Sequence, residues 1–223
     1  MAFLAITYSY KTIWAYFFNQ QSKPPDVAIL TGDIVKSSSL PKPQRFDLFH
    51  SFQILSGLIK QQYPDYVLYD LSKFLGDGWQ LLVDHPQKCF EISLFIHTYI
   101  RKTFKTEKLD TRIAIAIGSV EFVPEINISE GFGTAFTESV KMLDQLKNHR
   151  MGITLATKNG ERYSRLFDTL IRSYDTFIKT WTALQCQAVH LSLQGLTQAE
   201  IGKKWQPESL DQTTVNKHLA AAH

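Results

Sequence analysis

The chain has 223 residues, enough for one substantial domain and a small appendage, and its 44% apolar and 13% aromatic content excludes a disordered protein. Its two cysteines, Cys89 and Cys186, lie far apart in the chain and fit a reduced, cytoplasmic protein better than a disulfide-stabilised scaffold. The net charge is +3: residues 1–140 hold 13 Lys/Arg against 14 Asp/Glu, whereas residues 141–223 hold 11 against 7. This excess gives mild support for a nucleic-acid contact in the C-terminal part.

Residues 1–25 are interpreted as a separate N-terminal extension. The first eighteen are largely apolar but include Lys11 and several hydroxyl side chains, whereas a membrane span needs about 20 apolar residues. A secretory signal would need a basic start and a small-residue cleavage site, and this segment shows neither. We therefore predict an amphipathic helix that docks on the body or on a second copy, with a membrane anchor as the less favoured alternative.

Residues 26–158 predict an α+β domain. A Val- and Ile-rich strand ending near residue 35 precedes a helix over 44–63, whose apolar residues are expected to face a sheet: Phe46, Phe49, Ile54, Leu55, Leu58 and Ile59. Two strands meeting at a Gly-Asp-Gly turn, a helix over 86–104, a strand, a helix over 133–147 and a last strand follow. The order contains a ferredoxin-like, palm-type βαββαβ core, which is an antiparallel sheet covered by helices on one face.

The remainder of the chain is predicted to be helical. Residues 159–181 indicate a long amphipathic connector, and residues 182–223 three short helices. Gly195 is expected to end the first of these, and Thr197 to cap the second in a capping box. The expected small core consists of Leu196, Ile201, Trp205, Val215 and Leu219.

Two aspartates interrupt apolar stretches of the predicted sheet, Asp33 after the first strand and Asp77 in the hairpin turn. Like charges at the ends of neighbouring strands are tolerated when a cation lies between them, and an oxygen-rich site suits Mg²⁺ and substrate phosphates. The small residues after Asp33 offer backbone N–H groups to a polyphosphate. The alternative is structural: each aspartate marks a turn or caps the next helix.

Four segments, "LTGDIVKSSSL", "KFLGDGWQLLV", "RIAIAIGSV" and "GTAFTESVKML", resemble the signature segments of class III nucleotide cyclase catalytic domains over residues 26–157. The resemblance implies a Mg²⁺ or Mn²⁺ site at Asp33 and Asp77, with the Ile34 carbonyl as a further ligand. It also implies that Lys73 selects the purine. The nucleotide-binding residues implied in this way are Lys36, Ser37, Ser38, Ser39, Lys73 and Gly76.

The sequence departs from that family where turnover is decided. Thr137 stands where an Asn orients the ribose, Lys141 where an Arg stabilises the transition state, and Ile128 near a second purine contact. Lysine keeps the charge but loses the planar fork that grips phosphate. We therefore expect nucleotide binding with slow or absent cyclisation, with an active nucleotidyl cyclase as the alternative. Sites of this family form between two subunits, which implies a homodimer.

The last helices resemble helix-turn-helix segments of the sigma-factor and response-regulator type, with "QPES" lengthening the turn. The expected DNA-facing residues are Gln212, Thr213, Thr214, Asn216, Lys217 and His218. The alternative is a three-helix cap that mediates dimerisation. A cyclase-like domain followed by a helix-turn-helix resembles the SatD-like family of bacterial proteins. This resemblance predicts a DNA-binding regulator with a nucleotide-binding domain. A scaffold with two vestigial sites is a further alternative.

Overall fold

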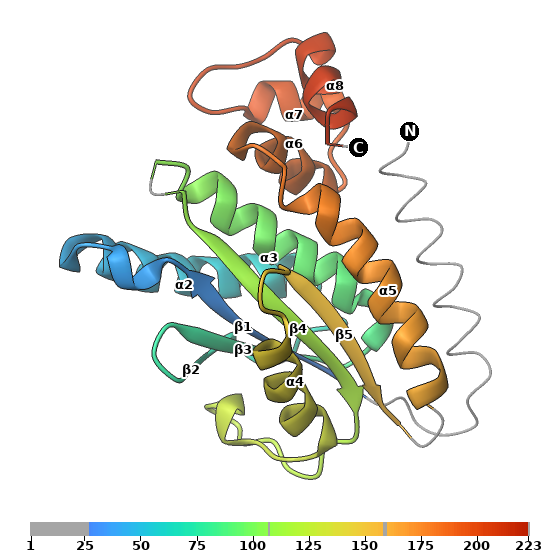
Figure 1. Cartoon of the computed structure of the whole chain (residues 1–223). Helices are drawn as coiled ribbons and strands as arrows, with labels where there is room; N and C mark the ends of the chain where they lie inside the picture. Colours follow the sequence, from blue (N-terminus) through green and yellow to red (C-terminus); the bar gives the residue numbers. More distant parts are fainter. Residues whose placement is uncertain (1–26, 107, 158–159, 223) are drawn as a thin grey trace.

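The computed structural model describes residues 27–106, 108–157 and 160–222 (Figure 1), without the side chains of residues 161 and 162. The extension predicted at residues 1–25 lies outside these ranges. The strands are β1 (Val27–Val35), β2 (Ser72–Phe74), β3 (Gly78–Val83), β4 (Asp110–Gly118) and β5 (Met151–Ala156). The helices are α2 (Lys42–Gln62), α3 (Cys89–Thr103), α4 (Thr134–Gln145), α5 (Gly160–Ile178), α6 (Ala183–Leu193), α7 (Gln198–Lys204) and α8 (Gln212–Ala220), with short 3-10 turns at Ser37–Ser39, Pro86–Lys88 and Ile128–Glu130. None of these helices is long and apolar enough to cross a membrane.

The five strands form one sheet in the order β2-β3-β1-β4-β5. From β1 to β4 the chain follows a βαββαβ arrangement, with β1 between β3 and β4 and antiparallel to both. β5 then pairs with β4 in parallel, because α4 carries the chain across the sheet before β5 begins. The α+β class is confirmed, and the strands of the βαββαβ core pair antiparallel as predicted, whereas β5, outside this core, adds a parallel edge strand.

Helices cover both faces of the sheet, whereas the sequence predicted one. On the first face, Ile115 and Ile153 of the sheet share a core with Phe95 of α3 and Phe167 of α5. On the other, α4 lies on the sheet, and its Phe136 packs with Ile29 (Figure 1). The central strands are apolar on both sides, so each face needs a covering layer.

The sheet-facing stripe of α2 is narrower than predicted. Leu55 and Ile59 are fully buried, as expected, but Phe46 is 74% exposed, Phe49 41% and Ile54 46%. The buried positions of this helix are Leu48, Ser51, Leu55, Ser56 and Ile59, which recur every three to four residues. The other three apolar residues fall outside this stripe, and their prediction as sheet-facing was wrong.

The free edge of β5 is closed by polar side chains of α5. The β5 amides of Ile153 and Leu155 donate to Asp168 Oδ1 (3.1 Å) and Ser164 Oγ (3.0 Å). The amide of Arg150, just before β5, donates to the fully buried Asp175 (2.7 Å). An edge strand otherwise presents unpaired N–H groups, so the predicted connector helix also acts as a sheet cover.

The three C-terminal helices share a small core formed by Ala188, Ile201, Trp205 and Val215, with Leu196 and Leu219 packed against it. This confirms the core predicted for residues 182–223. Thr197 forms the predicted capping box, and Gly195 ends α6 with a φ of 80°. α6 also joins the main core, because Cys186 and Val189 belong to it.

His190 of α6 is fixed between α3 and the C-terminal helices. Its ring lies 4.2 Å from that of Phe95, centroid to centroid, and its Nδ1 lies 3.3 Å from Thr98 Oγ1 and from the Phe95 carbonyl. Burial, with a smaller contribution from Lys102, lowers the pKa of His190 to about 3. The imidazole is therefore neutral in the folded protein at neutral pH.

This burial predicts a pH-dependent loss of stability. Between pH 6.5 and about 3 the unfolded chain binds a proton at His190 that the folded chain does not, so the free energy of unfolding falls as the pH falls. From pH 8 to pH 5 this residue should contribute a loss of about 2 kcal/mol. Urea unfolding of His190→Gln should show a loss smaller by that amount, whereas the exposed-site variant His50→Gln should follow the wild type. An unchanged pH dependence in His190→Gln would contradict the prediction.

Candidate carboxylate site

The first part of the site is the C-terminal end of β1. Gly32 pairs with Trp79 of β3, and a Cβ at residue 32 would collide with the Trp79 ring and with the carbonyl of Arg112. The glycine of "LTGDIV" is therefore needed for close strand packing. The next residue, Asp33, keeps only 22% of its side chain exposed.

Asp33 is held by an arginine on the neighbouring strand. The register places Asp33 opposite Arg112 of β4, and Arg112 Nε donates to Asp33 Oδ1 at 2.9 Å while its Nη2 donates to Oδ2. This is the bidentate geometry of a guanidinium on a carboxylate. The hydrogen bond to Asp33 is the main cause that raises the pKa of Arg112, and the charges of Asp144 and Asp77 add to it.

Asp77 lies in the turn between β2 and β3 and accepts a hydrogen bond from Ser37. The turn after β1 is anchored by Arg45, which donates to the carbonyls of Leu40 (2.9 Å) and Ser38 (3.0 Å). The serine turn and the hairpin turn thus meet, as the prediction of a shared site requires. Gly76 has a φ of 67°, a conformation that favours glycine.

A cation of the protein itself, Arg112, pairs with Asp33. The negative charges of Asp77 and Asp144 lie near enough to raise the pKa of Arg112 further. Arg112 and Asp144 were missed by the sequence analysis; the signal was a lone charge in the apolar strand "TRIAIAIG". In this state, a metal ion would compete with Arg112 for Asp33.

The residues present fit a weakly liganded hard cation better than a dedicated metal cage. No group of three or more His, Cys, Asp or Glu side chains in the described ranges is arranged to hold a metal ion. Two carboxylates beside a turn suit Mg²⁺, which keeps several waters and shares its ligands with substrate phosphates. Ile34 has a side chain that is 3% exposed and belongs to the core, so only its carbonyl is available as a ligand.

Lys73 and Asp77 line one pocket of about 590 Å³ between α2 and the hairpin. Its other walls include Phe49, Phe52 and Trp79, and Lys73 Nζ lies 4.5 Å from the centre of the Phe49 ring. An apolar pocket with a few polar groups is suited to a flat ring. Ile128 does not take part, because it is buried in the core on the other side of the sheet.

Among the described residues, neither Thr137 nor Lys141 forms a hydrogen bond or ion pair with Asp33. α4 begins beside Ser119, past the C-terminal end of β4, where the Ala135 amide donates to the Ser119 carbonyl at 3.1 Å. From there α4 runs back over the sheet, and Ser139 Oγ lies 2.6 Å from Thr31 Oγ1 of β1. Thr137 lines a separate pocket of about 560 Å³, and the exposed Lys141 pairs with Glu138 (2.7 Å).

Of the six residues predicted to face DNA, three have intramolecular partners. Thr214 donates to Asp211 at the start of α8, and Asn216 accepts from Gln198 (3.1 Å). The His218 ring stacks on Trp205 at 5.3 Å between centroids. The other three lie on the exposed face of α8: Gln212, Thr213 and Lys217.

Neither a family model nor a curated protein matches the chain. Two solved structures of a bacterial light-regulated adenylyl cyclase are weakly similar to 69% of it, at 18% and 17% sequence identity with TM-scores of 0.42 and 0.41. This chain spans 54% of the length of each of those chains. Similarity this weak supports no conclusion about activity, so function has to be argued from the residues themselves.

The competition at Asp33 can be tested with Arg112→Gln. Loss of the guanidinium should lower the free energy of unfolding by about 1–2 kcal/mol, because a half-buried carboxylate loses its partner. It should also raise the thermal shift produced by Mn²⁺, because Asp33 becomes available. Arg172→Gln is the matched control: Arg172 Nε pairs with Asp168 at 2.6 Å with similar exposure. A Mn²⁺ response that is unchanged in Arg112→Gln, or equally raised in Arg172→Gln, would rule out a cation site at Asp33.

Proposed function

We propose that this chain binds a nucleoside triphosphate together with Mg²⁺ or Mn²⁺ at the carboxylate site, with slow or absent turnover, and that it acts as a DNA-binding regulator. The observation that carries the first part is that two carboxylates, Asp33 and Asp77, lie on segments joined by the Ser37–Asp77 hydrogen bond, with one guanidinium, Arg112, paired to Asp33. The carboxylate charge left unpaired favours an additional cation. A nucleotide's phosphates would bring one to the site.

Each residue has a role in this proposal. Asp33 and Asp77 hold the cation, with the Ile34 carbonyl as a further ligand, and the cation neutralises phosphate charge. Arg112, released from Asp33, turns to a phosphate, because a guanidinium binds phosphate and carboxylate oxygens with the same planar fork. The turn Ser37–Ser39 offers hydroxyl and backbone N–H groups, while Lys36 adds positive charge beside it.

The base is proposed to enter the pocket beside Lys73. Phe49 and Phe52 offer aromatic surface there, and the Lys73 ammonium can donate to a purine carbonyl or ring nitrogen. Gly76, with its positive φ, allows the turn that carries Asp77, one of the residues lining this pocket.

Turnover is proposed to need a second chain. Thr137 and Lys141 are exposed on α4, which lies on the opposite face of the sheet from the α2 pocket, and a partner copy in the opposite orientation would bring them to the site of another chain. A homodimer is therefore part of the proposal. Even there, Thr137 has a shorter side chain than Asn, and Lys141 lacks the bidentate fork of arginine.

The nucleotide proposal is tested by thermal shift of the full chain with ATP or GTP and Mn²⁺. A stabilisation that requires the metal is expected, and it should be lost in Asp33→Asn but kept in Asp168→Asn, in which the altered carboxylate belongs to α5. Mass analysis of the mixtures should show no cyclic nucleotide, or a trace that Thr137→Asn/Lys141→Arg increases. Robust cyclic product from the wild type, abolished in Asp33→Asn, would establish the active cyclase instead, and no metal-dependent shift would leave the site vestigial.

The observation that supports DNA binding is that α8 keeps Gln212, Thr213 and Lys217 exposed on one face of a helix with its own core. Glutamine reads adenine edges, and lysine and threonine hold phosphates. The longer connection between α7 and α8 is packed, because the Leu210 amide donates to the Gly202 carbonyl at 2.9 Å. The rival interpretation is a three-helix cap for dimerisation.

Lys217→Ala separates these interpretations. It should weaken binding to duplex DNA and reduce the slope of log K against log salt by about one. The exposed lysine Lys42 of α2 provides the control, since Lys42→Ala removes the same charge from the main body. Equal effects of the two variants would indicate non-specific attraction between the protein and DNA. If the wild type does not bind DNA at low salt and Lys217→Ala changes the oligomeric state, the dimerisation cap is favoured.

A further inference from the structure

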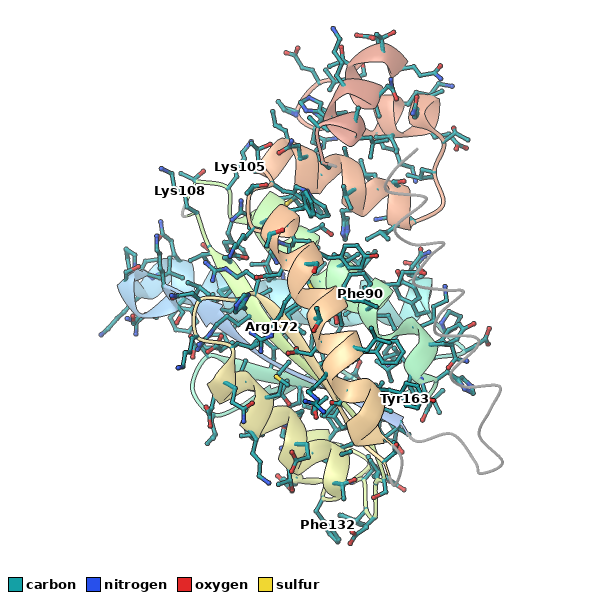
Figure 2. All side chains as sticks on the ribbon, turned by 45° about the vertical axis from the view of Figure 1, so that its right-hand side comes forward. Phe90, Lys105, Lys108, Phe132, Tyr163 and Arg172 are labelled. Carbon is teal, nitrogen blue, oxygen red and sulfur yellow. The ribbon has the colours of Figure 1, made fainter. Side chains whose placement is uncertain are left out.

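A basic pocket lies at the junction between the main body and the C-terminal helices. It has a volume of about 300 Å³ and lies between the end of β1, the segment joining α3 to β4, the start of β5 and the first residue of α6, Ala183. Its charged walls are Lys36, Arg101, Lys105, Lys108, Arg150 and Asp110. Figure 2 shows Lys105 and Lys108 near each other at this end of the body, far from Phe132.

The one carboxylate that the described residues contribute to the pocket is already neutralised. Asp110 is 4% exposed, and its Oδ2 accepts from Arg150 Nε at 2.7 Å and from Arg101 Nη1 at 3.3 Å. Its Oδ1 accepts from the Thr111 amide at 2.9 Å and lies 3.3 Å from Nδ1 of the buried His97. Of the lining residues that the structure describes, five carry a positive side chain, and the one carboxylate, Asp110, is already paired with two of them.

Within the described residues, the side chains of the three pocket lysines form no ion pair that would stabilise the fold. Lys36, Lys105 and Lys108 are exposed, and no ion pair joins any of them to another residue in the described ranges. Lys36 and Lys108 also have left-handed backbones, with φ of 69° and 54°. A non-glycine residue in this region carries a conformational cost of about 1 kcal/mol, and such positions are often found at functional sites.

We propose that this pocket binds the polyphosphate group of a small ligand, with pyrophosphate as the simplest form, without a metal ion. Concentrated lysine and arginine side chains match the charge of linked phosphates, and arginine adds paired hydrogen bonds. The α6 N-terminus at Ala183 contributes further positive potential. About 300 Å³ is at the small end of ligand sites, which suits a di- or triphosphate group and not a base and sugar besides.

The pocket is coupled to the C-terminal helices through Arg101. Its Nη2 donates to the carbonyl of Trp181, in the short link between α5 and α6, and the Trp181 indole donates to the Ala222 carbonyl at 2.9 Å. A bound polyphosphate contacts the same guanidinium and the first turn of α6. The ligand therefore stabilises the position of α6. Through the Trp181–Ala222 hydrogen bond it also stabilises the chain just after α8.

The test is calorimetric titration of the full chain with pyrophosphate in EDTA, followed by Lys105→Ala/Lys108→Ala. Binding should be saturable in the wild type and roughly tenfold or more weaker in the double variant. The matched control is Lys147→Ala, because Lys147 is also exposed, has a φ of 48° and is absent from the pocket walls. It should bind within about twofold of the wild type, and unchanged thermal unfolding of all variants shows that they are folded.

Further arms identify the ligand and separate this pocket from the carboxylate site, with which it shares Lys36. If the pocket recognises the polyphosphate group of a nucleotide, ATP in EDTA should compete with pyrophosphate for binding. If ATP does not compete, the ligand of the pocket is free pyrophosphate. Asp33→Asn should keep pyrophosphate binding even where metal-dependent nucleotide binding is lost. Hydrogen exchange of residues 181–184 should slow when pyrophosphate is added. The proposal is overturned if the wild type does not bind pyrophosphate without metal, if Lys147→Ala loses as much affinity as the double variant, or if only duplex DNA binds through these lysines.

Discussion

The antiparallel register of β1 with β4 is the constraint on which the rest of the structure depends. Nine residue pairs align from Val27 opposite Gly118 to Val35 opposite Asp110. This alignment sets Asp33 against Arg112 and brings Asp110 beside the end of β1. A slip of one residue would move every side chain of β1 to the opposite face, so packing of the apolar side chains and placement of the charged ones are determined together.

Charge at this end of the sheet is distributed unevenly. Near Arg112 the charges of Asp33, Asp77 and Asp144 all raise its pKa, whereas two residues earlier in β4, around Asp110, cations outnumber carboxylates among the described pocket residues. Each region contains a salt bridge between its own residues: Asp33 with Arg112 in the first, and Asp110 with Arg150 in the second. What remains unbalanced is negative in one region and positive in the other, which is the physical basis for assigning a metal–nucleotide to the first and a metal-free polyphosphate to the second.

The location of α6 links these regions to the C-terminal helices. α6 belongs to two cores, since Cys186 and Val189 pack in the main one and Ala188 in the small one. The neutral His190 sits at the same contact with α3. The C-terminal helices are consequently built onto the body and not attached by a flexible linker, so a ligand near the start of α6 acts on a packed contact and not on a loose tether.

The sequence by itself determined the order and type of the elements, the Gly-Asp turns and the small C-terminal core, because these follow from local periodicity, capping and turn chemistry. It also indicated Asp33, Asp77 and the serine turn as one site, and the structure joins Ser37 to Asp77. Only the tertiary structure decided which helices cover which face, that Phe46 and Ile54 of α2 face outward, and that α4, which carries Thr137, lies on the opposite face of the sheet from α2. Only it revealed that Arg112 holds Asp33, and that lysines from separate segments gather around Asp110. The physical reason is that these relations join residues distant in the chain through strand register and crossover, which local periodicity does not encode.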